Sequence, residues 1–240
     1  MKDYPSGAYI ISRGGRRGSG PRSPRRRPSR AAGMLIVILL LLTAGICLLV
    51  LFMPKLSERA DGNVNFKGKT FYFLSVATAT DRSEALMGAQ SARERGGAGY
   101  VFNNGSYRII AAVYDRESDA KTLASVNDGA DYFPVALPPL ACSESDRLLL
   151  ECIAGEFFTS VFTAATELDR GNISDSAAEF ALLKALSKLE KLAQNADNAA
   201  LARTVRNALE KDITVGMSVL SFVRYIQVYV VAGAYEACGG

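Results

Sequence analysis

The sequence of 240 residues contains no histidine and no tryptophan. Histidine is the commonest general base near neutral pH and a frequent zinc ligand, so its absence removes the usual residue for both kinds of chemistry. The four cysteines, at positions 47, 142, 152 and 238, lack the CxxC spacing of a metal site. We therefore expect no metal and no cofactor. The last three cysteines could form one disulfide or could be free buried thiols, and the sequence leaves both possibilities open.

Other catalytic patterns are also missing. The glycines at positions 96, 97 and 99 have neither the spacing nor the context of a phosphate-binding loop. The acidic residues are scattered along helical segments, whereas a glycan-cleaving enzyme needs two carboxylates paired in a cleft. The sequence therefore predicts a protein that is not an enzyme.

Residues 34–53, MLIVILLLLTAGICLLVLFM, form a run of twenty residues without a charge. A helix rises about 1.5 Å per residue, so a run of this length spans a hydrocarbon core of roughly 30 Å. The alternatives are a buried core helix and a cleaved signal peptide. A signal peptide has an apolar region of about 7–15 residues and a small-residue cleavage site, whereas Met53-Pro54-Lys55 follows here. We predict an uncleaved transmembrane helix.

The predicted transmembrane helix separates two regions of opposite charge. Residues 1–33 carry nine Lys and Arg against one Asp, a net +8, so a chain of net +4 leaves −4 for the rest. Basic residues favour the cytoplasmic side, which places residues 54–240 outside the cytoplasm. The tail is too polar to fold and is expected to be disordered. Its arginines suit either anionic lipid or nucleic acid; their juxtamembrane position explains them without nucleic acid.

A linker is expected over residues 54–69, followed by a domain over residues 70–140. Aromatic and β-branched runs alternate there with helical patterns, and Asn104-Gly105 marks a hairpin turn. The predicted order is β-α-β-β-α-β, which gives an α+β fold with a four-stranded antiparallel sheet and both helices on one face. The strands are expected at 71–78, 99–103, 107–114 and 132–137, and the helices at about 81–95 and 116–126.

Residues 106–124, SYRIIAAVYDRESDAKTLA, resemble the second half of a SPOR (sporulation-related) domain. The resemblance covers residues 70–137, less than a third of the chain. The matching positions are Tyr107, Arg108, Ile109, Tyr114, Asp119 and Ala120.

The resemblance implies a non-enzymatic module that binds peptidoglycan glycan strands at division or sporulation sites, anchored by a single span in a bacterial cell membrane. In that family the glycan lies on the open face of the sheet. Strand alternation points Leu74, Val76, Ile109, Ala111 and Val113 toward the helices. The residues predicted to line the open, glycan-binding face are Phe73, Ser75, Ala77, Arg108, Ile110 and Ala112.

Some positions depart from the family pattern. Ser75 stands where glutamine is common, and Ala77 and Ala112 stand where glycine is usual. The alternative is a membrane scaffold in which another part of the chain, or a partner, covers the sheet and the helical region binds a division or sporulation protein. A third hypothesis is an RNA-recognition domain, which has the same order of elements. Residues 107–114 lack the Gly-aromatic-Val-x-aromatic strand that is typical of that domain.

Residues 141–240 have helical periodicity, and short connections predict a bundle of about three helices. Ser143 and Asp146 form a capping-box pattern, and Ser174 has the position of a second helix cap. The third helix is expected from about residue 199 to beyond residue 225. Its last part, residues 213–235, is apolar enough that a second membrane span is an alternative. Arg224 near its middle favours instead a buried helix packed on the sheet.

Overall fold

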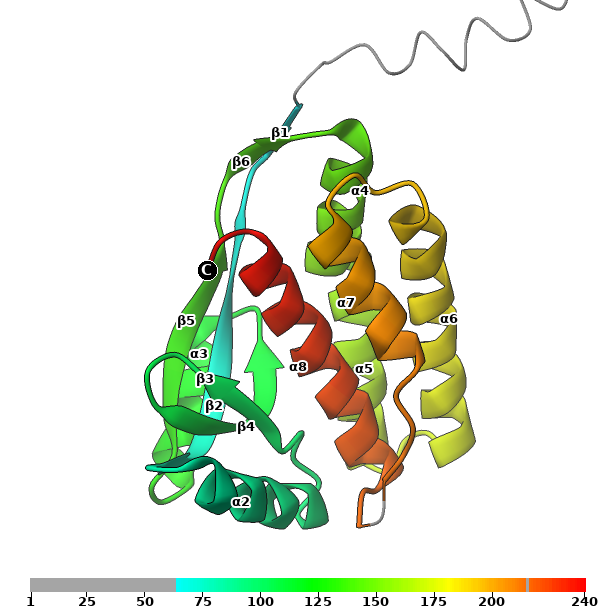
Figure 1. The fold of residues 1–240 in the computed structure, drawn as a ribbon. Coiled ribbons are helices and arrows are strands. Elements are labelled where there is room, and N and C mark those ends of the chain that lie inside the picture. Colours follow the sequence, from blue (N-terminus) through cyan, green and yellow to red (C-terminus); the bar gives the residue numbers. More distant parts are fainter. Residues whose placement is uncertain (1–63, 215) are drawn as a thin grey trace, which may run out of the picture. The chain divides into compact units, whose positions relative to one another are not determined.

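The computed structural model describes residues 64–214 and 216–240 (Figure 1). The predicted tail, the predicted transmembrane helix and residues 54–63 of the predicted linker lie outside the described residues. The described part has the predicted α+β fold, and beside the predicted four-stranded sheet it contains a two-stranded sheet that the sequence did not predict.

The larger sheet has the predicted β-α-β-β-α-β order. Its strands lie in the spatial order β3-β4-β2-β5, and every neighbouring pair is antiparallel. Asp81 caps the first helix by accepting a hydrogen bond from the Glu84 amide, and Glu84 accepts one from the Thr80 amide. The elements are β2 (Lys69–Ala79), α2 (Arg82–Glu94), β3 (Tyr100–Asn103), β4 (Tyr107–Tyr114), α3 (Glu117–Val126) and β5 (Asp131–Leu137).

A second sheet joins two short strands from the two ends of this region. Strand β1 (Val64–Phe66) pairs antiparallel with β6 (Leu140–Cys142). β1 lies in the segment predicted as a linker, because three residues are too few to carry a periodic signal. This pairing places the first described strand, β1, beside the residues that immediately precede the helical region.

The helical region begins with one long helix and continues with three more. The long helix consists of α4 (Glu144–Cys152), the π-helical turn η1 (Ile153–Phe157) and α5 (Phe158–Asp169). The helices after it are α6 (Asp175–Ala193), α7 (Ala199–Leu209) and α8 (Val219–Ala237).

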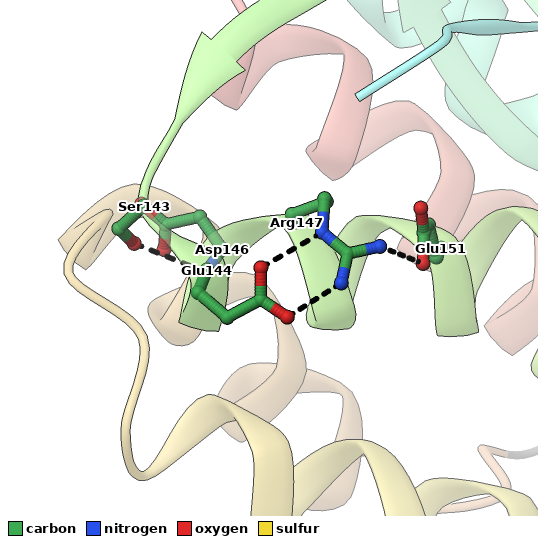
Figure 2. Close-up of polar contacts among 5 residues, drawn as sticks. All are labelled: Ser143, Glu144, Asp146, Arg147 and Glu151. Carbon is green, nitrogen blue, oxygen red and sulfur yellow. Dashed lines mark hydrogen bonds and ion pairs between the residues drawn. The ribbon is translucent and has the colours of Figure 1, made fainter. Parts of the chain in front are cut away.

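Ser143 caps α4, but the predicted capping box is only half formed. The Ser143 hydroxyl accepts a hydrogen bond from the Asp146 amide at 3.2 Å, whereas the Asp146 carboxylate accepts one from the Asn198 amide at 2.9 Å. On the exposed side of α4, Arg147 pairs with Glu144 and Glu151 (Figure 2). The buried carboxylate of Asp146 therefore ties α4 to the start of α7.

The single third helix that the sequence predicted is divided into α7 and α8. Gly216, in the connection, has a φ of +82°, which side chains other than glycine rarely adopt. Ser218 then begins a new helix by accepting a hydrogen bond from the Ser221 amide at 3.1 Å. Because the chain reverses there, α8 packs against α7, and a Cβ at Gly233 would lie 2.4 Å from the Thr204 side chain.

Helix α8 lies between the sheet and the other bundle helices (Figure 1). The main hydrophobic core contains residues of the sheet and of all the bundle helices, so it runs across the predicted domain boundary at residue 140. The predicted packing of the last apolar helix on the sheet is what the structure has.

Candidate functional site

Three of the six residues predicted to bind glycan are buried on the face of the sheet that α8 covers. Phe73 and Ile110 have no exposed surface, and Ser75 is 2% exposed. Phe73 and Ile110 belong to the main core together with Val228 and Val231 of α8. The Ser75 hydroxyl donates to the Ala77 carbonyl at 3.0 Å and so is satisfied within its own strand. The face that the resemblance assigned to a ligand is therefore occupied by the chain's own helix.

Two further residues, Ala77 and Ala112, lie on the opposite face, where α2 and α3 pack. Ala77 pairs with Ile109, in the cluster of α2, and Ala112 pairs with Leu74, in the cluster of α3. The register between β2 and β4 shifts on both sides of Ser75. A bulge inserts one unpaired residue and so reverses the alternation beyond it. The predicted faces of Ala77, Ala112 and Val113 are wrong for this reason.

Arg108 is the one predicted residue that lies on the α8 side of the sheet and keeps solvent contact. Its side chain is 26% exposed and pairs with Asp131 at 3.4 Å. The guanidinium lies 4.6 Å from the centre of the Phe133 ring, and Nε has no hydrogen-bond partner among the described residues. The six residues therefore do not form one exposed surface.

Polar contacts fix α8 to the end of α2 and to the turn that follows it. The Ser221 hydroxyl donates to the Arg93 carbonyl at 2.8 Å, and Arg224 donates to the Gly96 carbonyl at 2.9 Å. On the other side of α8, the Gln227 amide donates to the Phe158 carbonyl at 3.3 Å. A buried polar group without a partner is costly, so these matched contacts specify one position for α8 on the sheet.

A groove of about 490 Å³ opens between α2, α3 and the end of α5. Its lining includes Arg95, Arg170 and Arg224, which would suggest an anion site. However, α2, α3 and α5 all end there, and the carbonyl groups at a helix C-terminus carry partial negative charge. Arg224 already pairs with Asp169 at 2.9 Å. The arginines thus complement helix ends, and we assign this groove no ligand.

An exposed apolar groove of the bundle lies between α6, the end of α7 and the start of α8. Leu183 is 62% exposed and Ile213 is 43% exposed, although both are large aliphatic residues. With the half-buried Leu209 and Phe222 they line a groove of about 230 Å³, which we call the α6–α7 groove. Contiguous exposed apolar groups mark interaction surfaces more often than single ones do.

Sequence reasoning missed the α6–α7 groove although part of its signal was present. Leu182, Leu186 and Leu189 are buried along one stripe of α6 at helical spacing, and Leu183 lies beside this stripe rather than within it. Ile213 and Phe222 were assigned to one continuous helix, so their approach to α6 depended on the break at Gly216. An apolar residue just outside a complete core stripe was the available indication.

The three cysteines of the described residues are free thiols. Burial raises the pKa of Cys142 and of Cys238 above the ordinary value of 9.0, so both are neutral near pH 7. Within the described ranges, no three His, Cys, Asp or Glu side chains are grouped so that they could hold a metal ion.

One helix of the described part, Glu144–Asp169, is long and apolar enough to cross a membrane by length and composition. Half of its most apolar window is buried inside the domain, as in the core helix of a folded protein. The transmembrane helix predicted at 34–53 lies outside the described residues.

Comparison with known proteins finds no matching family model, no similar curated protein and no similar solved structure. The described part is an α+β domain in which a four-stranded sheet carries two helices on one face and a helical bundle on the other.

Proposed function

We propose that this protein is a membrane-anchored, non-enzymatic scaffold that binds a protein partner through the α6–α7 groove. In this proposal residues 34–53 anchor the chain, and the SPOR-like arrangement of strands serves as a structural platform for the bundle. The burial of Phe73 and Ile110 under α8 carries the proposal, because it removes the face on which a glycan strand would lie.

The exposed groups of the α6–α7 groove support a protein partner. Leu183 and Ile213 flank a concave surface whose rim carries Glu179, Lys211 and Asp212. An apolar centre with a charged rim is the usual composition of a protein interface. Large side chains of a partner would be desolvated at the centre, while the rim charges select its orientation.

The first test is photo-crosslinking of the full chain in its native cells, with the crosslinking residue at position 183 or 213. We expect a discrete crosslinked partner from both positions. Leu183→Asp, combined with the crosslinker at 213, should lower the yield about tenfold or more, because a charge would have to be buried at the interface. Leu86→Asp is the matched control, since Leu86 is a leucine on α2 that is 54% exposed.

The second test separates this proposal from peptidoglycan binding. Full-length protein in detergent is incubated with purified sacculi before and after an amidase removes the stem peptides. We expect little retention in either case and no difference between the wild type and Arg108→Ala. Retention that rises on stripping and falls in Arg108→Ala, together with absence of a crosslinked partner, would replace the scaffold by a glycan-binding module.

A further inference from the structure

Helix α6 presents a second surface on the side away from the α6–α7 groove. Phe180, Lys184, Lys188 and Lys191 follow one another at spacings of four, four and three residues. At about 100° per residue these positions fall within an arc of about 80°. Phe180 is 69% exposed, and the three lysines lie at the surface. We call these four residues the basic face of α6.

A groove beside the basic face owes its positive charge to the same three lysines. This groove, of about 520 Å³, runs between this side of α6 and the α4–α5 helix, and all three lysines line it. Glu156 is the one acidic residue of that lining, and it pairs with Lys188, so the lining has a net charge of +2. The acids of α6 itself, Asp175, Glu179 and Glu190, fall outside the arc.

The basic face has the composition of an interfacial membrane contact. Lysines carry their charge on long flexible stems, and an adjacent aromatic ring can enter the boundary between headgroups and acyl chains. Each basic residue near an anionic membrane surface contributes attraction that decays within a Debye length of about 10 Å. A protein partner would instead require the apolar centre that the α6–α7 groove has.

The length of the linker keeps the domain within reach of the bilayer. The predicted transmembrane helix ends at Met53 and strand β1 begins at Val64, so ten residues separate them. Fully extended, ten residues reach about 35 Å. The membrane is therefore a surface that the domain meets continually, at a high effective concentration.

We infer that the basic face of α6 docks on anionic phospholipid headgroups of the membrane that holds the anchor. Phe180 enters the interface, and Lys184, Lys188 and Lys191 contact headgroup phosphates. The inference rests on the anchor at residues 34–53 that the proposed function includes. It adds an orientation, in which α6 lies along the membrane.

The test uses the full chain in nanodiscs that contain a nitroxide-labelled lipid. One set of discs is made of phosphatidylcholine alone, and the other also contains phosphatidylglycerol. We expect paramagnetic broadening of the backbone amides of residues 180–191 only in the anionic discs. Replacing the three lysines by glutamine should lower the equilibrium constant for docking by about fivefold per lysine.

The controls distinguish the effect of net charge from the effect of where the charges lie. Arg116→Gln, Arg203→Gln and Arg206→Gln together remove the same charge from exposed positions elsewhere and should leave the broadening unchanged. Phe180→Ser keeps all charges and should weaken docking severalfold. Equal broadening in neutral and anionic discs, or its persistence in the lysine variant, would overturn the docking and leave the scaffold proposal intact. A chain that enters neither disc would overturn the anchor and the docking together.

Discussion

The two faces of the four-stranded sheet are packed in different ways. The face toward α8 carries Phe71, Phe73 and Phe102, whose rings join one core that continues through the whole bundle. The face toward α2 and α3 carries two separate small clusters, and alanines make up most of their buried residues. One face of the sheet therefore packs through aromatic rings, whereas the other packs against helices whose buried residues are alanines.

The difference shows which packing stabilises the domain. Aromatic rings bury large apolar areas, so the free energy of unfolding should depend mainly on the α8 face. Small side chains allow α2 and α3 to approach the sheet closely, but each removes little apolar surface from water. The face that a ligand was expected to occupy is thus the one on which folding depends most.

The largest expected effect comes from Phe73→Ala. Phe73 is fully buried and packs edge-on against Phe102, so its truncation should lower the free energy of unfolding by about 3–5 kcal/mol. Leu123→Ala, at a half-buried position on the other face, should cost about 1–2 kcal/mol. Urea unfolding of the full chain, followed by circular dichroism, measures both. Equal losses would remove the distinction between the faces.

A smaller loss of unfolding free energy is expected from removing one hydroxyl group from the helices on each face of the sheet. Ser221→Ala deletes a fully buried hydroxyl that donates to the Arg93 carbonyl, and should cost about 1–2 kcal/mol. Thr122→Ala deletes an exposed hydroxyl that donates to the Ser118 carbonyl on α3, and should change stability by less than about 0.5 kcal/mol. The same unfolding experiment compares them; a larger loss in Thr122→Ala would contradict the assigned docking of α8.

The smallest effect at neutral pH concerns Tyr100, whose ring lies against Tyr225 and Tyr229 of α8. Burial, followed by the nearby Glu236, raises the pKa of Tyr100 above the ordinary value of 10.0. Between the two pKa values the folded state keeps a proton that the unfolded chain has lost. Stability is therefore unaffected below about pH 10 and falls as the pH rises from there through the raised pKa.

Tyr100→Phe should flatten this alkaline loss, which unfolding curves between neutral pH and pH 11 would reveal. Tyr132→Phe is the comparison on the α3 side. Its hydroxyl donates to Glu117, and this hydrogen bond also raises the pKa of Tyr132, so the substitution should flatten the loss too, but less than removal of the buried phenol because the pair is exposed to solvent. A steeper alkaline loss in Tyr100→Phe than in the wild type would show that the phenol is not buried against α8.

The sequence predicted the order of elements from local signals. The hairpin at Asn104-Gly105 and the helix caps at Ser143 and Ser174 each act within a few residues, and the structure contains all three. The faces of Ala77, Ala112 and Val113 were not predictable, because a bulge has no signal in hydrophobic alternation. The break between α7 and α8 was missed because the periodicity continues on both sides of Gly216.

What the sequence determined by itself was the α+β class, the run of strands and helices around the hairpin, and the apolar helix that could not stay exposed. These follow from periodicity and capping, which involve neighbours along the chain. The sequence also favoured packing of the last apolar helix on the sheet, but only the tertiary structure decided which residues α8 buries there and that Leu183 and Ile213 line one groove. Such pairings join residues far apart in sequence, and they depend on how one apolar surface finds another rather than on any local pattern.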